Sequence, residues 1–206
     1  MEDDIEQAVL LDKLGERLAF ERQGTRLYEA LINKCESLGE ADGVRPSIDD
    51  LKDIHDEEKE HFALLQEVIL DLGGDPTIQT PSADISGVLS TGVLQVLTDP
   101  RTTVAQCLQA ALVAELSDND GWEMLIELAT TLDREDLAEK FEDALKNEQE
   151  HLEKVRLWLS SRTLQEADIS VDVGEELSTE GDAESEETGK ESRPKRKRRG
   201  TRKKKK

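Results

Sequence analysis

The sequence has few of the residues that build β-rich or disulfide-bonded domains. Aromatic residues make up 3% of the 206 residues, whereas charged residues make up 36%. This composition disfavours a β-sandwich and suits amphipathic helices built from Ala, Leu, Glu and Lys. Only two cysteines occur, Cys35 and Cys107, and they form no CxxC motif. Neither a disulfide framework nor a zinc cluster is therefore predicted.

Long apolar runs are also lacking. No stretch approaches the roughly 20 residues that a membrane span needs. The chain opens with Glu2, Asp3 and Asp4, the opposite of the basic start of a secretory signal peptide. We therefore expect a cytoplasmic protein.

The net charge of −21 hides two segments of opposite sign. Residues 190–206 hold twelve Lys and Arg and one acid, a charge of +11, so the rest of the chain carries −32. Residues 161–189 hold ten acids and almost no large apolar residues, a composition that cannot bury enough surface to fold. We predict an acidic disordered linker over 161–189 and a basic disordered tail over 190–206.

Residues 1–160 are predicted to form one all-α domain. Helical periodicity bounded by Gly and Pro recurs in four segments, at about residues 5–37, 46–72, 101–132 and 133–160. The connection over residues 73–100 is long, with a possible short helix at 85–97, whereas the other connections are short. The pattern predicts an antiparallel four-helix bundle with one long crossover.

Each predicted helix has an apolar stripe that is interrupted midway by a glutamate and, in two helices, by a histidine one turn later. No Lys or Arg shares the stripes. Several carboxylates in an apolar core would repel one another and would each cost several kcal/mol to desolvate, so two metal ions are the simplest compensation. Carboxylate and imidazole ligands suit iron or manganese. The six predicted ligands are Glu21, Glu58, His61, Glu115, Glu148 and His151.

An internal repeat supports this interpretation. Glu58-x-x-His61 aligns with Glu148-x-x-His151, and Glu21 and Glu115 are each followed seven residues later by an aromatic residue. A duplicated helix pair would give a site of approximate two-fold symmetry. The alternative is a metal-free bundle whose charged groups extend to solvent.

These motifs resemble the ferritin-like superfamily, closest to its rubrerythrin and bacterioferritin branches, over about residues 5–160. The resemblance implies a di-iron centre with two bridging carboxylates and a Glu–His pair at each end, although manganese could replace iron. The bridges would be Glu58 and Glu148, and the end pairs Glu21 with His61 and Glu115 with His151.

The resemblance also suggests roles for two neighbours. Tyr28 stands where rubrerythrins keep a tyrosine beside the ligands, although a core aromatic is the alternative. Asp118 stands where rubrerythrin has a further glutamate that can move onto the metal, or it accepts a hydrogen bond from a ligand histidine. Trp122 and Trp158 are interpreted as core packing.

Departures from the family limit the comparison. The chain lacks the four-cysteine rubredoxin module, so it would need an external electron donor. No short helix of the kind found in 24-subunit cages is predicted after Ser160, which disfavours a closed storage shell. We expect a homo-oligomer, a dimer or larger.

The leading functional hypothesis is oxidation of Fe(II) by O₂ or H₂O₂, as a ferroxidase or rubrerythrin-like peroxidase in iron homeostasis or oxidative-stress defence. One alternative is a di-iron hydroxylase acting on an organic or RNA substrate. Another is a protein that binds nucleic acid or polyphosphate through residues 190–206, without base reading because that segment has no aromatics. The acidic remainder of the chain would compete for the same tail.

Overall fold

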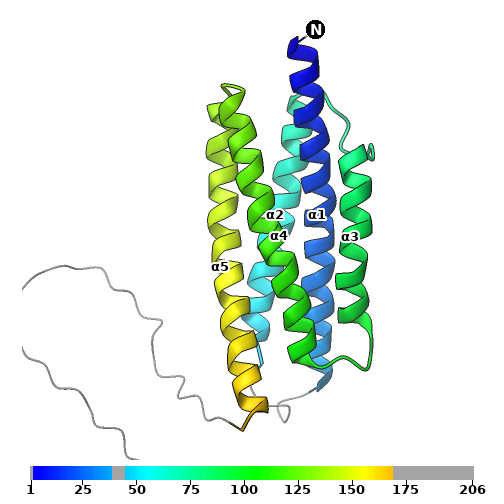
Figure 1. The fold of residues 1–206 in the computed structure, drawn as a ribbon, viewed down its shortest axis with the longest axis vertical. Coiled ribbons are helices and arrows are strands. Elements are labelled where there is room, and N and C mark those ends of the chain that lie inside the picture. The colour runs from blue at the N-terminus through cyan, green and yellow to red at the C-terminus, as the bar shows by residue number, and fades with distance from the viewer. Residues whose placement is uncertain (1, 39–44, 169–206) are drawn as a thin grey trace, which may run out of the picture. The chain divides into compact units, whose positions relative to one another are not determined.

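The computed structural model describes residues 2–38 and 45–168, and these ranges contain five α-helices and no strand (Figure 1). The predicted acidic linker from residue 169 onward and the predicted basic tail lie outside the described residues. The helices are α1 (Glu2–Leu38), α2 (Ile48–Asp71), α3 (Pro81–Thr98), α4 (Val104–Thr131) and α5 (Glu135–Glu166).

Helices α1, α2, α4 and α5 form the four-helix bundle, which confirms the predicted fold class. α1 and α2 run antiparallel, as do α4 and α5, and the crossover between the two pairs contains α3 (Figure 1). α3 packs against α1 and α4 on the outside of the bundle. This connectivity places the middles of the four bundle helices at one level.

The crossover helix is longer than the short helix predicted at residues 85–97. Thr80 caps its first turn and Pro81 occupies its first position, where a missing N–H costs nothing. The Asp12 carboxylate of α1 accepts hydrogen bonds from the Ser82 backbone N–H (3.0 Å) and from the Ser82 hydroxyl (2.6 Å). These contacts tie the start of α3 to α1.

Local signals define most of the other helix ends. Ser47 caps α2, and Thr103 and Gln106 form a capping box at the start of α4. Gly73, with φ of 77°, turns the chain after α2. α5 continues to Glu166, past the end predicted near Ser160, and an Arg162–Glu166 ion pair (3.2 Å) spans its last turn.

The core consists of two apolar clusters separated by a polar layer. One cluster contains Leu14, Leu65 and Phe141, and the other contains Leu31 and Ile54 with the two buried cysteines. The six predicted ligands lie in the layer between them. Trp122 is fully buried, and Trp158 packs on the second cluster, as predicted for core residues.

Within the described ranges, no helix combines the length and the apolar character that crossing a membrane requires.

Candidate metal centre

The six predicted ligands converge in the bundle core, as the levels of the four helices require. α1 and α4 contribute one glutamate each, whereas α2 and α5 contribute one Glu-x-x-His motif each. Every one of the six is at most 4% exposed. Burial of this many ionisable groups at one level is costly unless cations compensate it.

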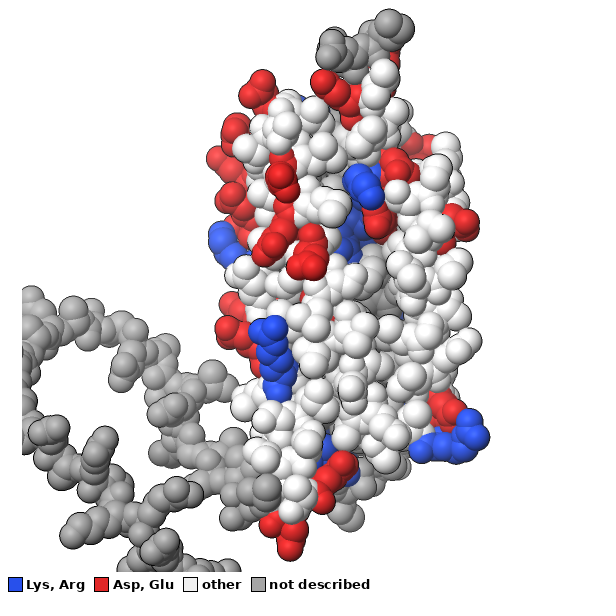
Figure 2. Space-filling view, viewed as in Figure 1, with Lys and Arg blue, Asp and Glu red and all other residues white. Residues whose placement is uncertain are grey.

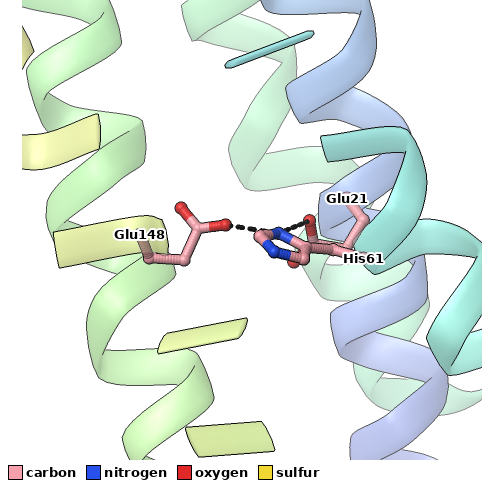
Figure 3. Close-up of side chains that lie close together, drawn as sticks. All are labelled: Glu21, His61 and Glu148. Atoms are coloured by element: carbon pink, nitrogen blue, oxygen red, sulfur yellow. Dashed lines mark ion pairs between the residues drawn. The ribbon is translucent and has the colours of Figure 1, made fainter. Parts of the chain in front are cut away.

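Glu148 occupies the middle of the cluster and faces both histidines. Its Oε1 lies 2.7 Å from His61 Nδ1, and its Oε2 lies 3.3 Å from His151 Nδ1. His61 Nδ1 also lies 3.8 Å from Glu21 Oε2, so this imidazole stands between carboxylates from two other helices (Figure 3). On the other side, His151 Nδ1 lies 3.7 Å from Glu58 Oε1.

The possible ligand atoms form three overlapping groups whose members lie within 4.8 Å of one another. Glu115 belongs to none of them, and its Oε1 accepts a hydrogen bond from the Tyr28 hydroxyl. Asp118, in contrast, joins one group. The groups are Glu21–His61–Glu148, Glu58–Glu148–His151 and Glu21–Glu58–Asp118–Glu148.

The donor set fits a pair of divalent cations. Among the described residues, no group donates a hydrogen bond to the buried Oε2 atoms of Glu58 and Glu115. The buried Nδ1 atoms of His61 and His151 point at carboxylate oxygens instead of at donors. Oxygen and imidazole atoms that converge in this way match the ligand preferences of iron and manganese.

The expectation that no basic side chain shares the stripes is wrong, because Arg17 reaches the centre. It is 4% exposed, and its Nε lies 3.0 Å from Glu21 Oε1 and its Nη2 3.2 Å from Asp118 Oδ1. Its place four residues before Glu21 puts it one turn along the same face. A Cβ at Gly121 would lie 1.8 Å from Arg17 Nη1, so this glycine leaves the room that the guanidinium occupies.

Arg17 offsets only part of the buried charge. Five carboxylates lie in the layer, counting Asp118, so one guanidinium leaves four negative charges. That remainder equals the charge of two divalent cations. Arg17 is therefore an additional partner of Asp118, for which a metal or a ligand histidine was predicted, and the argument for two ions is unchanged.

The carboxyl groups differ in how burial affects them. Burial raises the pKa of Glu21 and Glu115 well above the usual range, and negatively charged neighbours raise it further. Asp118 shifts in the same direction, because burial outweighs the opposing charge of Arg17. Burial would also raise the pKa of Glu148, but hydrogen bonds and charges from the two histidines lower it to about 2. Without bound cations, the buried carboxylates of the centre therefore repel one another strongly.

Three polar residues that support the cluster were not predicted from the sequence. Glu57 Oε2 lies 2.7 Å from His151 Nε2, and Asn147 Nδ2 lies 3.4 Å from His61 Nε2. The hydrogen bond to His151 lowers the pKa of Glu57. The internal repeat contained the signal for the first two, because each directly precedes the glutamate of a Glu-x-x-His motif. The third, Asn119, donates to the backbone carbonyls of Glu115 and Glu148, both at 3.0 Å.

A glycine in α1 also shapes the site. A Cβ at Gly24 would lie 2.1 Å from Glu58 Oε2. Gly24 therefore provides the space into which the Glu58 carboxylate of α2 extends toward α1.

Fold and site together define an all-α bundle with a buried carboxylate–histidine cluster. The chain belongs to the ferritin-like family, whose model, described as "Ferritin-like domain", matches residues 49–163. A crystal structure described as "ferritin like, diiron-carboxylate proteins from Bacillus anthracis str. Ames" has a similar fold, with a TM-score of 0.56. It shares 22% identity and covers 75% of this chain and 97% of that chain. No curated protein matches the chain with significance.

Proposed function

We propose that the chain is a di-iron carboxylate protein that oxidises Fe(II) with O₂ or H₂O₂. The observation that carries this proposal is the buried, cation-deficient cluster of four glutamates and two histidines at one level of the bundle. The structural neighbour, described as diiron-carboxylate, supports the same class of site.

The arrangement suggests how six ligands would be divided. Because the two oxygens of Glu148 face different histidines, this carboxylate is suited to bridge two ions. Glu58 would bridge beside it, while Glu21 with His61 and Glu115 with His151 would hold the two ends. Two bound iron ions would supply two electrons together to O₂ or H₂O₂.

The surroundings would orient the ligands and keep water out. The Tyr28 hydroxyl donates to Glu115, and burial and nearby carboxylates raise the Tyr28 pKa well above its usual value, so it stays a donor at neutral pH. The apolar clusters on both sides limit solvent access to the layer. We propose that Tyr28 positions Glu115 and that Asp118 is held by Arg17.

Stopped-flow mixing of Fe(II)-loaded protein with O₂ and with H₂O₂ tests the proposed reaction. The Glu58→Ala, Glu148→Ala double variant should lose the rapid oxidation phase. Glu60→Ala with Glu150→Ala is the matched control, because these exposed glutamates lie two residues further along the same helices. If the double variant and the wild type oxidise Fe(II) equally fast, the proposed reaction is wrong.

One observation favours the hydroxylase as a second candidate function. A cavity of about 270 Å³ lies between α1, α3 and α4, with a largely apolar lining that includes Leu27, Val93 and Leu94. Gly24 also lines it, and the Glu58 carboxylate lies directly behind this glycine. An apolar cavity of about 150 Å³ already holds a benzene ring, so the space suits a small apolar substrate.

Iron turnover separates the two candidates. A ferroxidase should oxidise many added Fe(II) ions per chain and should yield no oxygenated organic product. A hydroxylase should consume O₂ without oxidising iron beyond its two bound ions, and mass spectrometry should detect a product one oxygen heavier from an apolar probe such as toluene, supplied with a reductant.

A further inference from the structure

The duplicated helix pair places unlike residues behind its two histidines. Glu57 and Asn147 occupy equivalent positions, because each directly precedes the glutamate of a Glu-x-x-His motif. Each reaches across to the histidine of the other motif, Glu57 to His151 at 2.7 Å and Asn147 to His61 at 3.4 Å. In both cases the contact is made at Nε2, on the side away from the carboxylate cluster.

The two partners have different chemistry. A carboxylate only accepts, so Glu57 holds a proton on His151 Nε2 and leaves the Nδ1 lone pair directed at the cluster. An amide offers a donor and an acceptor and carries no charge, so Asn147 selects neither tautomer of His61. Loss of such an outer partner typically costs about 10–100-fold in metal affinity.

A second difference between the two metal positions also concerns the Glu21–His61 position. Arg17 lies within ion-pair distance of both Glu21 and Asp118. In the repeat, the equivalent of Arg17 is Ala111 on α4 and the equivalent of Asp118 is Gly24 on α1, so the Arg17–Asp118 ion pair has no counterpart beside Glu115. The guanidinium competes with a metal ion for the oxygens of Glu21 and repels a cation placed beside them.

Arg17 also borders a hollow at the surface. Arg17 lines a hollow of about 210 Å³ together with Glu16, Asp120 and Gly121. Acidic and basic side chains gather in the upper part of the face in Figure 2, whereas its middle is largely uncharged. Lys13 lines the hollow as well and lies 2.7 Å from Glu16, so the two acids of the hollow are matched by Lys13 and Arg17.

We propose that the two metal positions are unequal. The Glu115–His151 position binds its ion tightly, whereas the Glu21–His61 position binds at least tenfold more weakly and releases its ion more readily. Glu57, Asn147 and Arg17 are the positioning residues that set this difference. The inference rests on the proposed di-iron function, and it identifies which position loses its ion first.

Anaerobic titration of the metal-free full chain with Co(II), followed by calorimetry, measures the two affinities without any turnover. Wild type should bind one ion tightly and a second at least tenfold more weakly, and a chelator should remove one ion first. Asn147→Asp should tighten the weak step by about tenfold or more, because it restores a carboxylate behind His61. Glu57→Gln should weaken the tight step by a similar factor.

Ligand variants assign the steps to positions. His61→Ala should abolish the weak step and preserve the tight one, and His151→Ala should do the reverse. Arg17→Gln should tighten the weak step, with circular dichroism checking that the bundle remains folded. These shifts differ in direction, so general destabilisation would not reproduce them.

The outcomes separate this inference from the proposed function. Two equal affinities in wild type, or an unchanged weak step in Asn147→Asp, would overturn the inference even if Fe(II) is oxidised rapidly. Two separate steps without rapid Fe(II) oxidation would support the inference and overturn the proposed reaction. Binding of no Co(II) would overturn both.

Discussion

Gly24 and Gly121 serve the site through the side chain that each lacks. Gly24 leaves space for the Glu58 carboxylate, and Gly121 leaves space for the Arg17 guanidinium. Glycine in a helix interior costs about 1 kcal/mol relative to alanine. At these two positions the close approach of a charged group from another helix explains why glycine is present.

Substitution of Gly24 should therefore damage the site more than the fold. In Gly24→Ala the new methyl group would meet Glu58 Oε2 at 2.1 Å, so the carboxylate must move. We expect the metal-to-chain ratio to fall below two and the free energy of unfolding to drop by about 1–3 kcal/mol. Metal analysis by mass spectrometry and urea unfolding measure the two effects.

Gly92→Ala in α3 is the matched control, because an added Cβ there has no neighbour within 4 Å. It should keep its metal and should gain up to about 1 kcal/mol of stability. Equal metal content in both alanine variants and wild type would contradict the role given to Gly24.

At the scale of the elements, α4 and α5 are joined at ligand level by one amide. Asn119 Nδ2 donates to the carbonyl oxygens of Glu115 on its own helix and of Glu148 on the next. The bond to Glu148 holds the backbone of a proposed bridging ligand against the helix that carries Glu115. Helix register and ligand geometry are thus linked.

Asn119→Ala should loosen this link. It removes two hydrogen bonds whose acceptor carbonyls remain within their helices, so the expected cost is about 1–2 kcal/mol in urea unfolding. Co(II) affinity should also fall, because no side chain then fixes the Glu115 backbone of α4 relative to the Glu148 backbone of α5. Gln149→Ala, which removes an exposed amide of α5, should change neither quantity. A loss of stability with unchanged Co(II) affinity would restrict Asn119 to a packing role.

For the whole molecule, the pH dependence of stability should invert on metal binding. Glu21, Glu115 and Asp118 have raised pKa values in the folded chain, so the fold holds protons that the unfolded chain releases. The corresponding stability is present at acid pH and is lost as the pH rises through the raised pKa values. Glu148 acts oppositely, but only as the pH falls from 4.5 toward about 2.

The metal-free protein should thus melt at a lower temperature at pH 8 than at pH 5.5, by about 5 °C or more. Bound Fe(II) or Co(II) should remove or reverse this slope, because the metal binds the ionised carboxylates. Differential scanning calorimetry of both forms measures it. Glu115→Gln should flatten the slope of the metal-free protein, whereas Glu123→Gln, which removes an exposed charge of the same helix, should not. Equal slopes in both variants would assign the effect to net charge alone.

The predicted basic tail gives a second test at this scale. Twelve Lys and Arg in residues 190–206 should neutralise several phosphates, so the full chain should bind DNA or polyphosphate in a salt-sensitive way. A mobility-shift series over about 50–200 mM salt, with and without these residues, measures the contribution. We expect removal of the tail to abolish the shift. Equal binding of the two chains would exclude tail-driven association.

The bundle and the convergence of the six predicted ligands could be inferred from periodicity. A spacing of three or four residues puts side chains on one helix face, and short connections bring the middles of antiparallel helices to one level. Arg17 escaped this reasoning because its long side chain runs along α1 toward α4. α3 was underestimated although Thr80 and Pro81 give a local start signal, and its Asp12 anchor is a tertiary contact.

The sequence alone determined the helix order, the buried stripes and the duplicated Glu-x-x-His motif, because these depend on local periodicity and spacing. Tertiary structure decided which residue contacts which histidine and which glycines leave space for a neighbouring carboxylate or guanidinium. It also decided that the Arg17 guanidinium lies beside Glu21 and not beside Glu115. Those features depend on the reach of side chains between helices, a distance that only packing defines. The asymmetry of a site built from a repeated motif is therefore visible only in the folded chain.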